Sequence, residues 1–433
     1  MRSRPTVAFF PEPGTWGPTN NGVAVADVLR DRGFRVVFVV EESFRGVLEA
    51  RGFEEALFRV SPPPESEEQV GEGWAEWIRA TAPEFRKPTI EQLATVTKPI
   101  WEELVGHAKY AHDRLVEIFA ETRPDLIVSD NVCAFPAVNT AGVPWARAVS
   151  ANPLELEDPE LPPPLSGYPV GDRTGWDEFR EEYRRLHADL LADLNEFCLG
   201  TGAPPLPEGG FQYESPWLDY YLYPGEIDYP RSKPLGPTWH LLDSTIRTSD
   251  PPFDVSEPLP GEGEIVYLSL GSLGCMDTAL MQRLIDLLDR TPHRVIVSMG
   301  LLHRQLRLGE RMYGEPFLPQ TSIVPQCGLL VSHGGNNTLA EAFTFGLPTI
   351  ALPLFWDQYD NAQRLQETGF GVRLRTYEFE DGEFLGAVER LLADGPLRAR
   401  LAGIAARLQA EPGRVLGADL IEQVVRTGQP ATV

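Results

Sequence analysis

The residues best suited to binding an anionic ligand surround the sequence His333-Gly334-Gly335. The apolar run Leu329–Ser332 predicts a buried strand, and Asn337 and Thr338 begin a predicted helix. The first turn of a helix offers free backbone N–H groups and the positive end of the dipole, which together bind phosphate. The glycines let the backbone approach a ligand, and a histidine ring N–H can donate to a phosphate oxygen. The pattern predicts a diphosphate site; the alternative is a plain turn beside a core histidine.

Side chains at neighbouring strand ends extend this predicted site. Phe317 precedes the strand and is placed to stack on a base, while Glu341 lies one helical turn further on and can accept from ribose hydroxyls. Asp357 and Gln358 follow the next predicted strand, Thr349–Leu352, and suit the hydroxyls of a sugar. The candidate residues for this ligand are Ser272, Phe317, Gln320, His333, Gly335, Asn337, Thr338, Glu341, Trp356, Asp357 and Gln358.

Strands alternate with helices in both halves of the chain, which predicts two doubly wound parallel sheets. Thr6–Phe10, Arg35–Val40 and Leu126–Ser129 are short apolar strands of the first half, and Ile265–Leu270 opens the second. We therefore expect an α/β protein with two Rossmann-like domains that face each other across a cleft. The predicted divisions are an N-terminal acceptor domain at 1–235, a Pro/Gly/Ser-rich linker at 236–263, a nucleotide-binding domain at 264–410 and a C-terminal helix at 411–433 that packs back on the first domain.

Length and composition narrow the class of protein. A chain of 433 residues is long enough for two domains, and a net charge of −25 argues against nucleic acid and anionic membrane surfaces as partners. The four scattered cysteines predict neither a disulfide framework nor a zinc site. Val7–Phe10 is too short for a signal sequence, and no run approaches the roughly 18 apolar residues of a membrane span. These features predict a cytoplasmic protein, and we expect a monomer or homodimer without a resident cofactor.

From Phe317 onward the chain resembles the donor signature of the family 1 glycosyltransferases, the UDP-sugar and dTDP-sugar transferases of plants and of actinobacterial antibiotic pathways. The matching residues are Phe317-Leu-Pro-Gln, His333-Gly-Gly-Asn-Asn-Thr, Glu341, Gly346-Leu-Pro, Pro353, Asp357-Gln and Asn361. The match covers the last third closely and the first half loosely. Many members have tryptophan where Phe317 stands.

This resemblance implies a GT-B fold and metal-independent, inverting transfer of a hexose to a small, hydrophobic natural product. It implies that Phe317 contacts the base of a UDP- or dTDP-sugar and Glu341 the ribose. It further implies that His333, Asn337 and Thr338 contact the diphosphate, and that Asp357 and Gln358 contact the sugar.

The usual catalytic base of this family is missing. Members carry a histidine after the first strand, oriented by an aspartate, but the turn Pro11–Asn21 contains no histidine. Asp130 matches the orienting aspartate, and we hypothesise that it is the base, directly or through a water; the alternative is a helix cap for the segment starting at Val132. Glu12 is a second candidate, or else an exposed loop acid. Asn20 stands where the histidine is expected.

Aromatic residues of the first half are candidates for an acceptor pocket, although each alone is equally consistent with ordinary core. The acceptor candidates are Trp16, Trp74, Trp77 and Phe135, joined by Trp101, Trp145 and the proline-rich loop Leu161–Leu165. Three alternative functions stay open: a lipid or sterol glycosyltransferase, a sugar-nucleotide epimerase, and a non-catalytic binding protein that has lost the histidine.

Overall fold

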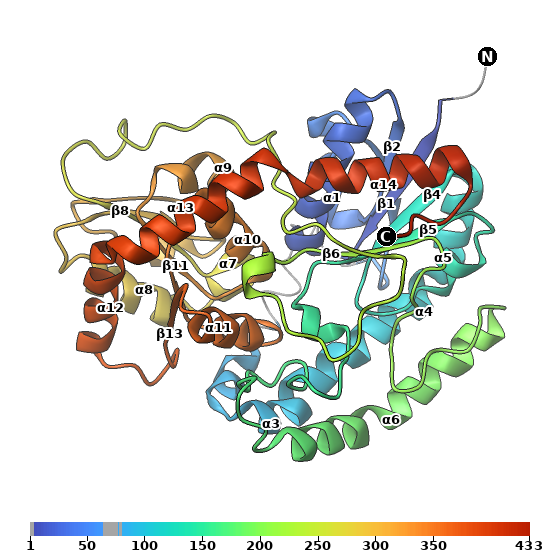
Figure 1. Cartoon of the computed structure of the whole chain (residues 1–433), viewed down its shortest axis with the longest axis horizontal. Coiled ribbons are helices and arrows are strands. Elements are labelled where there is room, and N and C mark those ends of the chain that lie inside the picture. Colours follow the sequence, from blue (N-terminus) through green and yellow to red (C-terminus); the bar gives the residue numbers. More distant parts are fainter. Residues whose placement is uncertain (1–3, 64–76, 78–79) are drawn as a thin grey trace.

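Apolar runs of three to seven residues form two separate parallel sheets (Figure 1). The computed structural model describes residues 4–63, 77 and 80–433. The N-terminal sheet has the order β3-β2-β1-β4-β5-β6-β7. Its strands are β1 (Thr6–Pro11), β2 (Arg35–Glu41), β3 (Glu54–Phe58), β4 (Leu126–Asp130), β5 (Trp145–Val149), β6 (Leu218–Tyr221) and β7 (Trp239–Leu241). The last of them, β7, lies within the range that the sequence predicted as linker.

Both faces of the N-terminal sheet are buried, which is why its strands read as nearly continuous apolar runs. Along β4, Leu126 and Val128 belong to one buried cluster, and Ile127 belongs to the other. The helices packed against this sheet or joined to it are α1 (Trp16–Asp31), α3 (Thr89–Gln92), α4 (Lys98–Thr122), α5 (Pro136–Thr140) and α6 (Trp176–Gly200). Helix α1 covers the Val128 face, and α4 covers the Ile127 face.

The C-terminal sheet has the order β10-β9-β8-β11-β12-β13. Its strands are β8 (Ile265–Ser269), β9 (Arg294–Ser298), β10 (Met312–Glu315), β11 (Leu329–Ser332), β12 (Thr349–Ala351) and β13 (Gly371–Arg373). Its helices are α7 (Gly271–Gly274), α8 (Thr278–Leu288), α9 (Gln320–Ile323), α10 (Asn336–Phe345), α11 (Gln358–Glu367), α12 (Asp381–Ala393) and α13 (Gly395–Ala410). The predicted two-domain α/β architecture is therefore present.

The chain ends in α14 (Gly413–Thr427), which leaves the C-terminal domain and lies along the N-terminal one (Figure 1). Its buried Ile421 and Val424 join the apolar cluster that contains Val25 of α1. A Cβ atom at Gly413 would lie 1.7 Å from the carbonyl oxygen of Leu242, so only glycine permits this close approach.

In each sheet the chain reverses its direction of winding between two neighbouring strands, β1 and β4 in the first and β8 and β11 in the second. Ligands of doubly wound sheets bind beyond the carboxyl ends of strands at such switch points. Asp130 ends β4 beside Pro11, and Gly271 and His333 follow β8 and β11. The candidate residues of both domains thus lie where the topology predicts a ligand.

No helix in the described part of the chain is long and apolar enough to cross a membrane. All four cysteines are free.

Candidate active site

The imidazole of His333 is held between two glycines. A Cβ atom at Gly271 would lie 2.6 Å from its Cε1 atom, and a Cβ at Gly335 would lie 2.5 Å from its Nε2 atom. Both distances are too short for real contacts, so a side chain at either position would displace the ring. Gly271 also has a φ of 74°, which favours glycine. The two glycines therefore fix the ring next to the amino end of α10.

At this position His333 contributes a hydrogen bond rather than a charge. Burial lowers the pKa of His333 to about 4, so the ring is neutral near pH 7. The Ser332 hydroxyl lies 3.3 Å from Nδ1. The residue before α10 is Gly335, which has no side chain to cap the first-turn N–H groups. A neutral imidazole carries a single N–H, which is at Nε2 when the Ser332 hydroxyl donates to Nδ1. In that tautomer the Nε2–H and the open end of the helix together suit a diphosphate.

The two asparagines that open α10 bind the opposite domain. Asn337 donates to the Gly17 carbonyl oxygen at 2.8 Å and accepts from the amide of Asn21 at 2.7 Å. Asn336 donates to the Leu222 carbonyl oxygen at 2.7 Å. The Asn337 side chain therefore bridges the two domains, and a diphosphate would meet the backbone of α10 or displace these contacts.

The residues predicted to contact the nucleoside include an exposed ring and a buried carboxylate with an arginine partner. Phe317 is 59% exposed, which leaves its ring free to stack on a base. Glu341 is buried and accepts from Gln320 at 2.6 Å and from Arg247 at 3.2 Å. Burial raises the pKa of Glu341, and the charge of Arg247 opposes that rise. Arg247 also pairs with Asp250.

Sequence reasoning missed Arg247, because a single arginine in a proline-rich segment carries no recognisable pattern. Thr338 is buried with its hydroxyl 3.5 Å from the Gln320 amide, and Ser272 is exposed in α7. The structure thus brings Gln320, Thr338 and Glu341 together.

The residues after β12 include Asp357 and Gln358, which were predicted to contact the sugar. Asp357 accepts from the backbone N–H of Asn152 at 3.0 Å and from the Asn361 amide at 3.2 Å, and burial raises its pKa to about 6. Gln358 uses its amide oxygen to accept from the backbone N–H of Leu354 at 3.0 Å, so it holds its own loop. Trp356 has a φ of 59°, an uncommon conformation for a bulky residue.

Both domains contribute to a cavity of about 130 Å³ that includes Asp357. One set of lining residues is aromatic and another carries carboxyl groups. The aromatic residues are Trp101, Tyr183, Phe211 and Trp356; the acidic ones are Glu155, Glu157, Asp357 and Asp360. Arg147 also lines the cavity and pairs with Glu155 at 2.6 Å. Of these acids only Asp357 was expected in the site from the sequence; Glu155, Glu157 and Asp360 were not, because they join it from segments that meet only in the fold.

Other predicted acceptor residues lie elsewhere. Phe135 is buried in the core with its ring centroid 4.9 Å from that of Phe10, and Trp16 packs against Phe44 at 5.2 Å. The ring centroid of Trp77 is 6.3 Å from that of Phe355, and Trp77 does not line the cavity. Trp74 lies outside the described residues. By contrast, Trp101 and Leu165 of the proline-rich loop do line it.

Two candidate bases lie side by side at the carboxyl ends of β4 and β1. Asp130 accepts from the Ser150 hydroxyl at 3.0 Å, and burial raises its pKa to about 7. Glu12 is buried, not an exposed loop acid, and accepts from the Val132 N–H at 3.0 Å. Burial raises the pKa of Glu12 to about 8, so it is mostly protonated near neutral pH. Asp130 is the better matched base.

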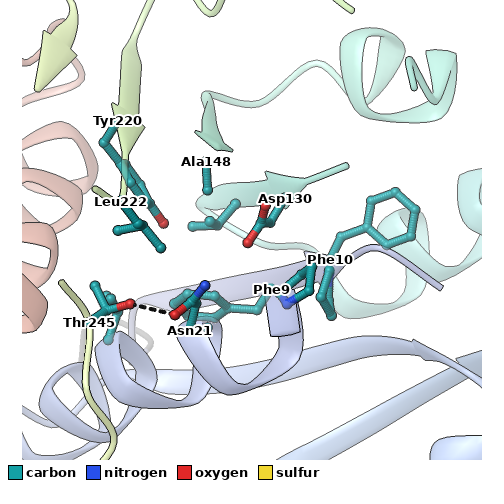
Figure 2. A pocket seen from close by; sticks show the side chains of 13 residues that line it. Phe9, Phe10, Asn21, Asp130, Ala148, Tyr220, Leu222 and Thr245 are labelled. Atoms are coloured by element: carbon teal, nitrogen blue, oxygen red, sulfur yellow. Dashed lines mark hydrogen bonds between the residues drawn. The ribbon is translucent and has the colours of Figure 1, made fainter. Parts of the chain in front are cut away.

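Two sequence expectations near these acids need correction. The segment after Asp130 is not helical, since α5 begins only at Pro136, so Asp130 caps no helix there. The Asn20 side chain accepts from Arg51 at 3.5 Å, whereas its neighbour Asn21 lines a small pocket together with Asp130 (Figure 2). The helical turn of α1 explains the difference, because consecutive residues point about 100° apart.

The whole chain was compared with known proteins, and it is similar to several glycosyltransferases. Residues 283–422 match the model of the erythromycin biosynthesis protein CIII-like C-terminal domain. Demethyllactenocin mycarosyltransferase of Streptomyces fradiae is 26% identical over 96% of this chain and 86% of its own length. The chain is thus similar to the family 1 glycosyltransferases. It is therefore an enzyme that transfers a sugar to a small-molecule acceptor.

Solved glycosyltransferase structures share the fold. The calicheamicin glycosyltransferase CalG4 has a TM-score of 0.68 and 18% identity, with 99% of this chain and 100% of that chain covered. The spinosyn rhamnosyltransferase SpnG, solved with thymidine diphosphate, has a TM-score of 0.66 and 16% identity, with 97% and 99% covered. The two sheets of this glycosyltransferase are thus the two halves of a GT-B fold.

Proposed function

We propose that this glycosyltransferase moves a hexose from dTDP- or UDP-sugar to a hydroxyl group of the acceptor, with inversion at the sugar carbon and without a metal. The observation that carries the proposal is the position of His333, between Gly271 and Gly335 at the open end of α10. This end lies at the switch point of the C-terminal sheet, next to the cavity that both domains line. The spinosyn rhamnosyltransferase was solved with thymidine diphosphate, which supports a donor of that class.

Inversion follows from one displacement at the anomeric carbon. The acceptor oxygen forms its bond to that carbon as the bond to the diphosphate oxygen breaks, and the electron pair leaves with the diphosphate. The first-turn N–H groups of α10 and the His333 ring N–H stabilise the developing negative charge. Asp130 takes the proton of the acceptor, for which a pKa of about 7 is well matched.

The acceptor that fits the cavity combines an apolar face with hydrogen-bond donors. Trp101 and Phe211 stack with ring centroids 4.1 Å apart and offer a flat apolar wall. Ionised carboxylates such as that of Asp357 only accept hydrogen bonds, so the ligand must bring donors to them. A hydrophobic natural product that carries hydroxyl or amino groups meets both requirements.

Thermal unfolding with nucleotides tests the donor proposal. The full-length protein is heated with EDTA present and with dTDP, UDP, ADP or GDP added. A ligand at 100 times its Kd stabilises the folded state by about 2.7 kcal/mol, which raises Tm by a few degrees. We expect dTDP or UDP to raise Tm, and His333→Ala to lose most of that rise.

His293→Ala is the matched control, because His293 lies just before the amino end of β9 and pairs with Glu389. It should keep the full response to the nucleotide. An unchanged Tm with both dTDP and UDP would contradict the proposed donor. Products from an acceptor screen then give the anomeric configuration by NMR, and retention would contradict a single displacement.

A further inference from the structure

A second, smaller pocket lies beneath the carboxyl edge of the N-terminal sheet, between the sheet and α1 (Figure 2). Its volume is about 10 Å³, which corresponds to one water molecule. Most of its wall is apolar, including Phe9, Val25 and Val128. Four polar side chains line it: Asp130 at the end of β4, Tyr220 of β6, Asn21 of α1 and Thr245 (Figure 2).

The Tyr220 hydroxyl is the unusual member of this group. Tyr220 is only 3% exposed, and among the described residues its hydroxyl has no hydrogen-bond partner. Because Tyr220 lines the pocket, a water there is the partner that its hydroxyl can reach. Figure 2 shows the hydroxyl directed into the pocket that Asp130 also lines. Burial and the charge of Asp130 raise the pKa of Tyr220, so it stays a hydrogen-bond donor.

Asp130 can accept such a donor. One of its carboxylate oxygens, Oδ1, accepts from the Ser150 hydroxyl, and a carboxylate has about four lone-pair positions in all. The Asn21 side chain already has hydrogen-bond partners, because its amide donates to Asn337 and its oxygen accepts from Thr245 at 3.0 Å. A water in the pocket would therefore accept from Tyr220 and donate to Asp130.

The position of the pocket connects it to the reaction. Asp130 lines the small pocket and does not line the larger cavity with Asp357 and Trp101. Leu222 also lines the small pocket, and its carbonyl oxygen accepts from Asn336 in the first turn of α10. The pocket is thus next to the helix end where the diphosphate is expected to depart. Pro11 and Pro18, which also line the pocket, belong to the segment Pro11–Asn21, where the family resemblance implies a histidine.

We propose that Tyr220 is a positioning residue that holds a water against Asp130, and that this water passes the acceptor proton to Asp130 in place of the absent histidine. This inference rests on the proposed function. As the acceptor oxygen bonds to the anomeric carbon, its proton moves to the water, and the water releases one of its own protons to the Asp130 carboxylate. The diphosphate leaves with the electron pair of the broken bond, so charge and atoms balance.

High-resolution crystal structures of the full chain and of Tyr220→Phe test the water itself. We expect electron density for a water about 2.7–3.2 Å from both the Tyr220 Oη atom and an Asp130 carboxylate oxygen, and loss of that density in Tyr220→Phe. A wild-type pocket without water, or a water that is unaffected by the substitution, would overturn the proposal. This result does not depend on any substrate.

Titration of Asp130 tests the coupling. Its carboxyl carbon is followed by NMR in protein labelled with 13C-aspartate, and its signal is assigned by its absence in Asp130→Asn. Loss of a donor to the charged form should raise the pKa, so Tyr220→Phe is expected to shift the midpoint upward by about 0.5. Tyr221→Phe is the control, because Tyr221 is the next residue on the opposite face and donates to Asp228.

An unchanged Asp130 midpoint in Tyr220→Phe, or an equal shift in Tyr221→Phe, would refute the coupling. Stabilisation by dTDP, measured on the same two variants, keeps the two proposals apart. If the wild type binds dTDP and the midpoint does not move, the donor proposal stands and the water relay fails. If no nucleotide stabilises the wild type, the proposed function fails whatever the titration shows.

Discussion

The substitution Gly335→Ala should weaken donor binding through one contact, that of the new Cβ atom with the His333 ring. The backbone at Gly335 has φ −62° and ψ 140°, which any residue can adopt, so alanine brings no backbone strain. Its Cβ would lie 2.5 Å from the His333 Nε2 atom, whereas ordinary contacts begin at 3.4 Å, so the ring must move by roughly 0.9 Å. Gly271 contacts the imidazole too, and its φ of 74° restricts how that loop can shift.

A ring displaced by this distance cannot keep a well-aligned hydrogen bond to a diphosphate. A hydrogen bond to a charged group contributes about 1.5–3 kcal/mol, so we expect dTDP to bind roughly 10–150 times more weakly. Isothermal titration calorimetry at 25 °C, well below Tm, gives the Kd directly. Gly386→Ala is the matched control: Gly386 lies within α12 with open space around it, and alanine there should leave the Kd unchanged.

A double-mutant cycle makes the test stringent. Once His333→Ala has removed the ring, Gly335→Ala has nothing to displace, so the double variant should bind dTDP about as weakly as His333→Ala alone. Additive losses would show that alanine at Gly335 acts through the backbone of α10. Wild-type affinity in Gly335→Ala would refute the role assigned to His333.

Three further predictions follow from exposure and charge. Phe317→Ala should weaken dTDP binding by about 5–150-fold, the range of a lost base stack, while Tm without ligand stays the same because Phe317 is 59% exposed. Asp130→Asn should lower kcat by about 10²–10⁴ without changing the stabilisation by dTDP. The wild-type rate should fall below about pH 7, as the Asp130 carboxylate is protonated, and a rate that does not change with pH would exclude Asp130 as the base. Burial raises the Glu12 pKa from 4.5 to about 8, so the folded state keeps a proton that the unfolded chain releases. The free energy of unfolding should therefore fall as the pH rises from about 4.5 to 8, and Glu12→Gln should melt with a smaller pH dependence; an unchanged slope in the variant would contradict this.

Local patterns explain what could be predicted before the structure. A buried strand, two glycines and a helix start are contiguous in Leu329–Phe345, so their geometry depends little on the rest of the chain. The same holds for the alternation of strands and helices, which determines parallel sheets and places His333 and Asp357 at carboxyl edges. The position of Asp130 at the end of β4 followed from the same rule.

Other features depend on segments far apart in the sequence. Asp130 and Tyr220 are 90 residues apart in the sequence. They face one pocket because β4 and β6 lie on either side of β5 in the sheet, and Ala148 of β5 lines the same pocket. The acidic lining of the larger cavity joins Glu155 of one domain to Asp357 of the other.

Burial also decides chemistry that composition cannot. The sequence alone shows Glu12 and Asp130 as two acids of ordinary pKa, and it favours Asp130 only through its match to the orienting aspartate of the family. Desolvation in the folded protein raises both values, to about 8 and about 7, and so distinguishes a mostly protonated acid from a usable base. The sequence by itself predicted a donor site at a helix end; tertiary packing decided how far the pKa values of the two acids rise, because the cost of a charge depends on what surrounds it.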